Sequence, residues 1–111
     1  MDKFVFPKNF LWGAATSGHQ VEGNNRDSDW WKWESEGRVK EPSGKACNHY
    51  NLFKEDFKLA KQLNHNAHRF SIEWSRVEPR QGSFDKEAIN HYREVINNLK
   101  SSSIEPIVTI N

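Results

Sequence analysis

A chain of 111 residues can form at most one small domain, and with 35% apolar residues a core built from it alone would be thin. The net charge of +1 and the lack of a Lys- and Arg-rich stripe exclude a nucleic-acid interface, and no apolar run is long enough to cross a membrane. The single cysteine, Cys47, cannot form a disulfide within the chain. We therefore expect a cytoplasmic protein with no nucleic-acid and no membrane partner.

The first organised stretch is an apolar run that gives way to small and then to polar residues. Phe10 to Ala15 predict a buried strand, and the polar residues that follow, among them Gln20 and Glu22, predict a functional loop at its end. Small residues such as Gly13 leave room for a ligand beside the backbone. A buried strand in which Gly13 serves only packing fits the spacing equally well.

A long loop and a helix come next. The 30 residues from Thr16 to Lys45 predict a loop, and loops of this length are uncommon unless they are functional. From Ala46 to Leu63 the apolar residues recur at steps of three and four, which predicts an amphipathic helix. Asn64 follows the last of them, at the position where a helix end favours a left-handed residue.

Residues 67–74 alternate in polarity, which predicts a second strand. An exposed antiparallel strand shows this alternation, and so does a barrel strand whose polar face lines an active site. The apolar face would carry Phe70, Ile72 and Trp74, and the polar face would carry Arg69, Ser71 and Glu73.

A second helix and a third strand complete the pattern. Asp85 is a suitable N-cap for a helix that reaches Leu99 with its apolar residues on one face. An apolar strand from Ile104 to Ile110 follows. About 36 residues separate Ser71 from Ile107, which is enough for one strand–helix unit. The alternation therefore predicts an α/β fold with parallel strands.

Three segments together resemble glycoside hydrolase family 1, which contains β-glucosidases and β-galactosidases. They are residues 10–23, residues 68–76 (His68-Arg-Phe-Ser-Ile-Glu-Trp-Ser-Arg76) and residues 104–111, in the order and spacing of the family. The family fold is a TIM barrel, (β/α)8. The resemblance implies that residues 1–111 are the N-terminal part of a single barrel domain, an incomplete α/β barrel with its first three strands and two helices.

The resemblance also implies an activity and two site residues. Such relatives are retaining β-glycosidases that hydrolyse terminal β-D-glucosides or galactosides by double displacement without a cofactor. Gln20 matches the glutamine that hydrogen-bonds the sugar at the cleavage site, and a carboxamide can donate and accept at once. Arg69 matches the arginine that orients the nucleophilic carboxylate and keeps it ionised. The alternatives are a Gln20 bonded to backbone and an Arg69–Glu73 ion pair.

Neither catalytic motif of the family occurs in this sequence. The relatives carry their acid/base in an Asn-Glu-Pro motif and their nucleophile in a Glu-Asn-Gly motif, and the chain contains neither triplet. We therefore assign no catalytic residue and expect the isolated chain to be inactive. Glu22 is interpreted as a structural partner within its loop. The expected partner is the remaining barrel polypeptide; the alternatives are a non-catalytic truncated partner, a sugar-binding fragment and an autonomous α/β domain.

The tryptophans and histidines allow further interpretations. Trp30, Trp31 and Trp33 are candidates for sugar stacking, because an indole offers an apolar face and one N–H donor, and core packing is the alternative. Trp74 is expected to pack on the apolar side of its strand. The five histidines are scattered, so no metal site is expected. The choice between glucosides, galactosides and phosphorylated glycosides stays open.

Overall fold

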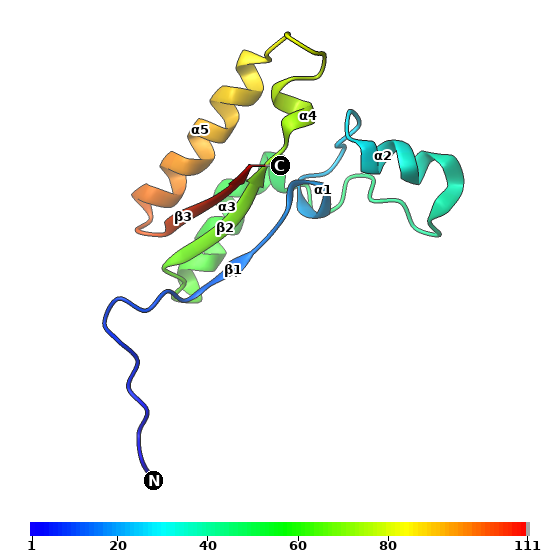
Figure 1. The fold of residues 1–111 in the computed structure, drawn as a ribbon. Coiled ribbons are helices and arrows are strands. Elements are labelled where there is room, and N and C mark those ends of the chain that lie inside the picture. The colour runs from blue at the N-terminus through cyan, green and yellow to red at the C-terminus, as the bar shows by residue number, and fades with distance from the viewer. Residues whose placement is uncertain (111) are drawn as a thin grey trace.

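The computed structural model describes residues 1–110 and contains a parallel sheet of three strands in the order β1-β2-β3 (Figure 1). The strands are β1 (Gly13–Ala15), β2 (Ala67–Ile72) and β3 (Glu105–Ile110). In the register of the sheet, Arg69 of β2 lies between Ala15 of β1 and Ile107 of β3. The predicted α/β arrangement with parallel strands is confirmed.

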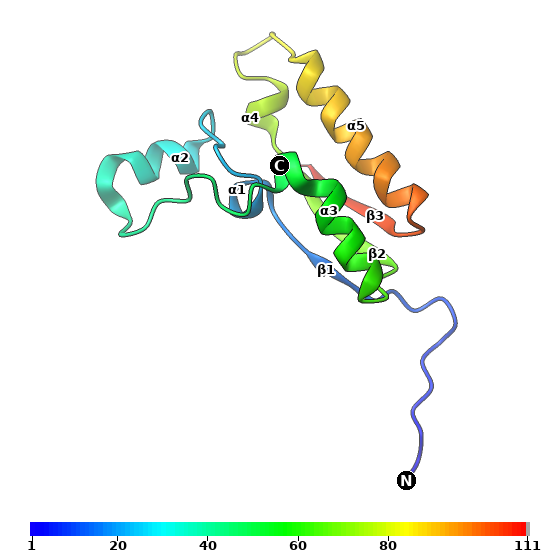
Figure 2. The ribbon, with the colours of Figure 1, turned by 180° about the vertical axis from the view of Figure 1, so that it is seen from behind.

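Two long helices connect the strands: α3 (His49–Gln62) lies between β1 and β2 in the chain, and α5 (Lys86–Ser101) lies between β2 and β3. Helix α3 passes behind the strands in Figure 1 and in front of them in Figure 2. Asp85 caps α5, as predicted, by accepting hydrogen bonds from the N–H groups of Glu87 and Ala88. Within residues 1–110, no helix combines the length and the apolar character needed to cross a lipid bilayer.

The core lies between β2 and the two long helices. Its buried cluster consists of Phe53, Phe57, Phe70, Tyr92, Val95, Leu99 and Ile104. Because Phe70 faces the helices, its neighbours Arg69 and Ser71 face the other side of the sheet. The register places Ala15 and Ile107 on that side with Arg69. We call this side, marked by Ala15, Arg69, Ser71 and Ile107, the helix-free face.

The first strand is shorter and more exposed than the sequence predicts. Residues 10–12 lie outside the strand, and the Asn66 side chain hydrogen-bonds the backbone of Trp12 and Phe10. Its carboxamide accepts from the Trp12 N–H at 2.6 Å and donates to the Phe10 carbonyl at 3.0 Å. All three residues of β1 are exposed. The prediction of a buried strand from Phe10 to Ala15 is therefore wrong for the described residues.

The stretch from Thr16 to Lys45 is also not the loop that the sequence predicts. It contains three short helical segments, α1 (Gly18–Val21), α2 (Asp29–Trp33) and η1 (Glu34–Arg38). Ser28 caps α2 by accepting a hydrogen bond from the Trp31 N–H at 3.1 Å. Segments of four or five residues complete about one turn, so no hydrophobic period can reveal them.

Backbone conformation sets the ends of the long helices. Ala46 and Asn48 have φ values of 46° and 54°, so α3 begins at His49 and not at Ala46 as predicted. Asn64 has a φ of 61°, which confirms the predicted left-handed residue after α3. Ser103 has a φ of 56° after α5.

The second strand ends earlier than predicted. β2 stops at Ile72, and Glu73 is the N-cap of a short helix, α4 (Trp74–Val77). Because the chain leaves the sheet here, the alternation of the strand no longer places Trp74 on the apolar side. The Trp74 residue is 49% exposed. The prediction that Trp74 packs against the strand is therefore wrong.

Candidate functional site

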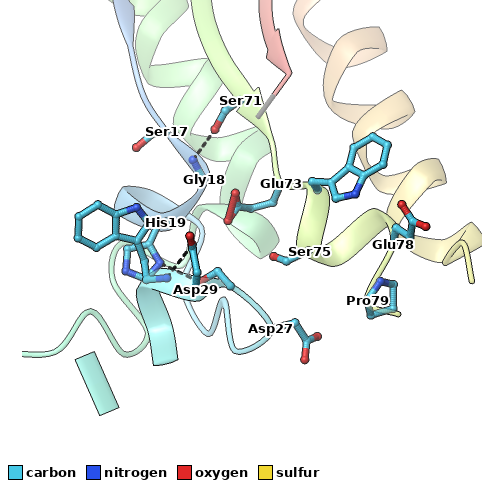
Figure 3. A pocket seen from close by; sticks show the side chains of 13 residues that line it. Ser17, Gly18, His19, Asp27, Asp29, Ser71, Glu73, Ser75, Glu78 and Pro79 are labelled. Carbon is cyan, nitrogen blue, oxygen red and sulfur yellow. Dashed lines mark hydrogen bonds between the residues drawn. The ribbon is translucent and has the colours of Figure 1, made fainter. Parts of the chain in front are cut away.

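The carboxyl-terminal ends of β1 and β2 lie side by side, and each is followed by a short helix. Between α1, which follows β1, and α4, which follows β2, a cleft of about 520 Å³ opens (Figure 3). Its walls come from residues 17–19, residues 27–30, residues 73–75 and residues 78–79, with Ser71 at the end of β2. In parallel α/β folds, this end of the sheet is where binding sites lie.

Helix α1 is attached to β2 by backbone hydrogen bonds at its start. The Thr16 N–H donates to the Arg69 carbonyl at 2.9 Å, and the Gly18 N–H donates to the buried Ser71 hydroxyl at 2.7 Å. Gly18 also lies close to Glu73, since a Cβ atom on it would be 2.8 Å from Glu73 Cγ. Helix α1 is thus attached to the carboxyl-terminal end of β2, the strand that carries Arg69.

Glu22, which follows α1 directly, is a buried carboxylate with two partners. The Tyr92 hydroxyl donates to Oε1 at 2.8 Å, and Arg76 Nε donates to Oε2 at 2.8 Å. Burial raises the pKa of Glu22, while the Arg76 charge and the Tyr92 hydrogen bond lower it. Glu22 is thus a structural partner, as interpreted from the sequence, but its partners lie in α4 and α5 and not in its own loop.

Tyr92 of α5 joins Glu22 to the end of β2. Its hydroxyl donates to the Glu22 carboxylate and accepts the Glu73 N–H at 3.2 Å. Burial and the neighbouring Glu22 charge raise the pKa of Tyr92, so the hydroxyl keeps its proton and remains a donor. A buried tyrosine hydroxyl with both functions satisfied fixes two segments relative to each other.

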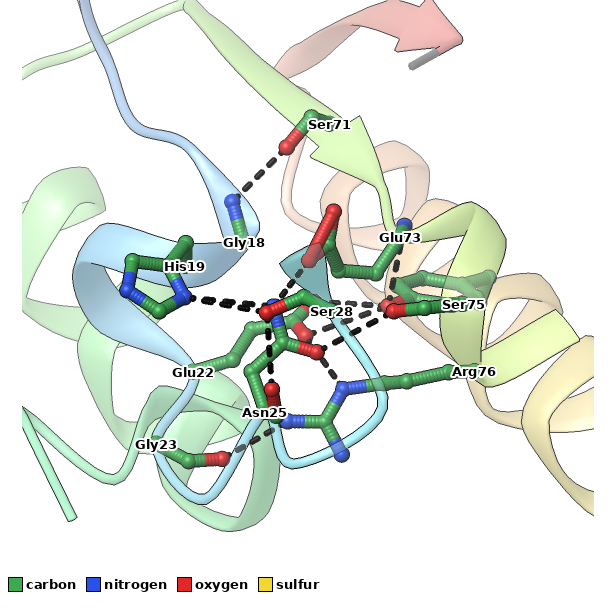
Figure 4. A network of polar contacts seen from close by, with 11 residues as sticks. Gly18, His19, Glu22, Gly23, Asn25, Ser28, Ser71, Glu73, Ser75 and Arg76 are labelled. Atoms are coloured by element: carbon green, nitrogen blue, oxygen red, sulfur yellow. Dashed lines mark hydrogen bonds and ion pairs between the residues drawn. The ribbon is translucent and has the colours of Figure 1, made fainter. Parts of the chain in front are cut away.

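A second group of polar contacts connects α1 and α4 with the segment before α2, and α1 with η1 (Figure 4). The buried Asn25 carboxamide donates to the Glu73 carboxylate, and its oxygen accepts from the Ser75 hydroxyl at 3.4 Å. His19 Nε2 lies 2.8 Å from Glu34 Oε1, and this hydrogen bond lowers the pKa of Glu34. These contacts hold the walls of the cleft together.

Gln20, the predicted sugar-binding residue, lies on α1 with an exposed side chain. Within residues 1–110 its carboxamide makes no hydrogen bond, so the backbone-bonded alternative does not occur there. Its neighbour His19 lines the cleft, whereas Gln20 lies outside the lining. Its role in sugar binding stays a prediction.

Arg69, the predicted partner of the nucleophile, lies in the middle of β2 with an exposed side chain on the helix-free face. The alternative of an Arg69–Glu73 ion pair is not formed among the described residues. The Glu73 carboxylate accepts a hydrogen bond from Asn25 instead. The Arg69 guanidinium is therefore left exposed on the helix-free face.

The tryptophans of α2 differ in exposure. Trp30 and Trp33 are 57% and 40% exposed, and their ring centroids lie 5.6 Å apart in an edge-to-face contact. Trp31 is half-buried, and the Arg26 guanidinium lies 5.9 Å from the centroid of its ring. Trp30 lines the cleft, and so does Trp74. Aromatic surface is thus available on both walls, and the contribution of Trp74 was not predicted.

Tyr92 and Arg76 were not identified as part of this region from the sequence. Tyr92 is one of the residues on the apolar face that predicts α5, and a buried tyrosine hydroxyl needs a polar partner. That requirement is the signal that could have identified it. Arg76 lies inside one of the three family-like segments, but nothing in its spacing points to Glu22.

Comparison with known proteins places the whole chain in one family. Residues 2–111 match Glycosyl hydrolase family 1. Putative myrosinase 6 of Arabidopsis thaliana is 44% identical over 97% of this chain and 24% of its own length. Beta-glucosidase A of Acetivibrio thermocellus is 32% identical over 99% of this chain and 27% of its own length.

Solved structures of β-glycosidases also match this chain. A beta-glycosidase from Pyrococcus horikoshii is 50% identical, with a TM-score of 0.90 over 95% of this chain and 25% of that chain. A family 1 β-glucosidase from Thermotoga maritima is 37% identical, with a TM-score of 0.89 over 96% of this chain and 26% of that chain. This chain spans about a quarter of the length of the proteins it matches. The open sheet is therefore part of a TIM barrel, as predicted.

Proposed function

Because the chain belongs to glycosyl hydrolase family 1, as its three segments predicted, we propose that it is the N-terminal part of a retaining β-glycosidase. The substrates would be terminal β-D-glucosides, which the names of its β-glucosidase relatives support, or β-D-galactosides. Double displacement needs an acid/base and a nucleophilic carboxylate about 5–5.5 Å apart. Both would come from the rest of the barrel, since the chain contains neither motif.

This chain would bind the sugar and orient the nucleophilic carboxylate. The Gln20 carboxamide would donate to one hydroxyl of the sugar and accept from another. The Arg69 guanidinium would hydrogen-bond the nucleophilic carboxylate and keep it ionised, because a nearby positive charge favours the charged form. Trp30, Trp31 and Trp33 would offer rings for stacking; of these, Trp30 and Trp33 are the more exposed.

The observation that carries the proposal is that Arg69 is exposed on the helix-free face of β2, while α1 is attached to the carboxyl-terminal end of the same strand. Hydrogen bonds from Thr16 to Arg69 and from Gly18 to Ser71 hold α1 at that end of the strand. In a closed barrel, the face opposite the helices turns toward the lumen. Ala15, beside Arg69 in the register, has a small side chain that leaves room for a ligand.

The rest of the barrel would be the partner of this chain. Along β3, the residues Ile107, Val108 and Ile110 are 43%, 37% and 75% exposed, and a parallel strand is normally paired and covered on both faces.

A cytoplasmic location is a prediction from the sequence alone.

A chimera allows the proposal to be tested. In it, residues 1–111 of this chain replace the matching N-terminal quarter of the Pyrococcus horikoshii beta-glycosidase, which is 50% identical over 95% of this chain. The change Gln20→Ala leaves sugar hydroxyls without a partner. We expect it to lower kcat/KM for p-nitrophenyl β-D-glucoside by about 5- to 150-fold, the equivalent of about 1–3 kcal/mol.

Gln62 at the end of α3 provides the matched control, because it is also an exposed glutamine on a helix. We expect Gln62→Ala to leave kcat/KM within about twofold of the chimera. If Gln20→Ala behaves like Gln62→Ala, Gln20 does not bind the sugar.

A further inference from the structure

We propose that Glu22, Arg76 and Tyr92 are positioning residues that hold α1, and with it Gln20, in the orientation that binds the sugar. The inference rests on the function proposed above, in which Gln20 contacts the sugar. Glu22 and Tyr92 are only 5% and 3% exposed, so neither can contact a ligand extensively. They would act on Gln20 through the backbone that follows α1.

Helix α1 cannot fix its own orientation. It has four residues, and its N-cap residue Ser17 makes no side-chain hydrogen bond to the helix. A helix of one turn is not stable by itself in water, because the cost of starting a helix is not recovered over so few residues. The orientation of Gln20 must therefore come from contacts with the rest of the chain: the His19–Glu34 hydrogen bond and the contacts at the two ends of α1.

The first end is held by β2. The Gly18 N–H donates to the buried Ser71 hydroxyl at 2.7 Å. Together with the Thr16 N–H bond to the Arg69 carbonyl, this hydrogen bond fixes the start of α1 but leaves its direction open. Gln20 lies two residues further along, so a second anchor beyond Gln20 is needed to define the direction of the helix.

Arg76 of α4 supplies the second anchor. Its Nε donates to Glu22 Oε2 at 2.8 Å, and its Nη2 donates to the Gly23 carbonyl at 2.6 Å (Figure 4). A guanidinium is planar, so two such bonds fix both acceptors in one geometry. One side chain thus holds the two residues that directly follow α1.

Tyr92 of α5 connects this anchor to the sheet. Its hydroxyl donates to Glu22 and accepts the N–H of Glu73, the first residue after β2. The residues that follow α1 are thereby tied to the end of the strand that also binds the start of α1. Gln20 lies between two anchors that share one strand.

Removing the Tyr92 hydroxyl should loosen α1 without removing a group that contacts the sugar. A displacement of about 1 Å can cost on the order of a hundredfold in rate. In the chimera, we expect Tyr92→Phe to lower kcat/KM for p-nitrophenyl β-D-glucoside by about tenfold or more. A loss of this size alone would not separate positioning from general damage to the fold.

A double-mutant cycle with Gln20→Ala makes that separation. If Tyr92 acts through Gln20, its hydroxyl has nothing left to position once Gln20 is alanine. We then expect Tyr92→Phe to lower kcat/KM by less than about twofold in the Gln20→Ala background. If Tyr92 only stabilises the fold, the tenfold loss persists in that background and the inference is overturned.

Two further variants keep the test decisive. Arg76→Lys keeps the charge but loses the double hydrogen bond, and it serves in the same cycle if Tyr92→Phe fails to fold. Tyr50→Phe is the matched control, because the Tyr50 hydroxyl makes no hydrogen bond within residues 1–110; we expect it to stay within about twofold of the chimera. A Gln20→Ala variant with full activity would instead refute the proposed sugar contact, and the inference with it.

Discussion

The Glu22 carboxylate and the Arg76 guanidinium form an ion pair with 2.8 Å between Oε2 and Nε, although 54 residues separate them in the sequence. The Glu22 and Arg76 side chains are 6% and 18% exposed. The pair joins the segment that follows β1 to the helix that follows β2. Two of the family-like segments therefore depend on each other for their structure.

Breaking this pair should be costly. In the chimera, Arg76→Met leaves the buried Glu22 carboxylate without its counter-charge, and removing one partner of a buried pair costs about 3–5 kcal/mol. We expect a clear fall in the guanidinium chloride concentration at the midpoint of unfolding. Arg93→Met, at an exposed arginine of α5, should change the free energy of unfolding by less than about 0.5 kcal/mol. Equal shifts of the unfolding midpoint for Arg76→Met and Arg93→Met would show that the ion pair adds nothing to the stability of the fold.

Gly23 should tolerate alanine far less than Gly37. Both have a positive φ, of 85° and 76°, so both changes cost about 1 kcal/mol of backbone strain. At Gly23 the added Cβ would overlap the Lys45 carbonyl oxygen. At Gly37 the added Cβ would have no neighbouring atom of the described residues within 4 Å. We expect Gly23→Ala to lose about 1–3 kcal/mol more than Gly37→Ala in denaturant unfolding of the chimera. Equal losses would show that the backbone can move at Gly23.

Buried histidines predict a loss of stability in acid. Burial and the neighbouring histidines lower the pKa of His68 to about 4, and its Nδ1 has no hydrogen-bond partner within residues 1–110. Between about pH 6.5 and pH 4 the unfolded chain binds a proton that the folded chain does not. Stability therefore falls with decreasing pH across this range, by up to about 1.4 kcal/mol per pH unit from His68.

The variant His68→Gln tests this dependence. Because it lacks the titrating group, its unfolding free energy should fall less steeply than that of the chimera between pH 6.5 and pH 4.5. At pH 7.5 and above, the two curves should run parallel. Identical slopes in acid would mean that His68 is protonated in the folded state.

The isolated chain should be inactive and should associate with itself. It carries neither catalytic motif, and β3 presents exposed apolar residues such as Ile110 at an unpaired edge. We expect no release of nitrophenol from aryl β-glucosides and an apparent mass above that of a monomer in light scattering. A monomer with a sharp near-ultraviolet circular dichroism spectrum and cooperative unfolding would contradict the expectation of a fragment, as would turnover that a covalent glycosidase inactivator abolishes.

Periodicity predicted the long elements because each extends over several turns or residue pairs. The spacing of Phe53 and Phe57 identified α3, and the alternation around Phe70 identified β2. Periodicity failed at α1 and α2, which are too short to show a repeat. It also failed at Trp74, because the alternation predicts a side of the strand only while the chain stays in the sheet.

The candidate site was predicted in part. Resemblance to the family singled out Gln20 and Arg69, and the structure shows both side chains to be exposed. The contacts that support α1 could not be predicted, because Tyr92 lies 70 residues from Glu22 in the sequence. Hydrogen bonds across such separations depend on how α5 packs against the sheet, and no local pattern encodes that packing.

The most direct test of the central claim is the steady-state hydrolysis of p-nitrophenyl β-D-glucoside by the chimera. If residues 1–111 are the N-terminal part of a β-glycosidase barrel, they should supply their share of the sugar site beside the catalytic carboxylates of the Pyrococcus horikoshii enzyme. We predict a kcat/KM within about tenfold of that enzyme. A chimera that unfolds cooperatively and shows its parent's near-ultraviolet spectrum, yet releases no nitrophenol, would contradict the claim.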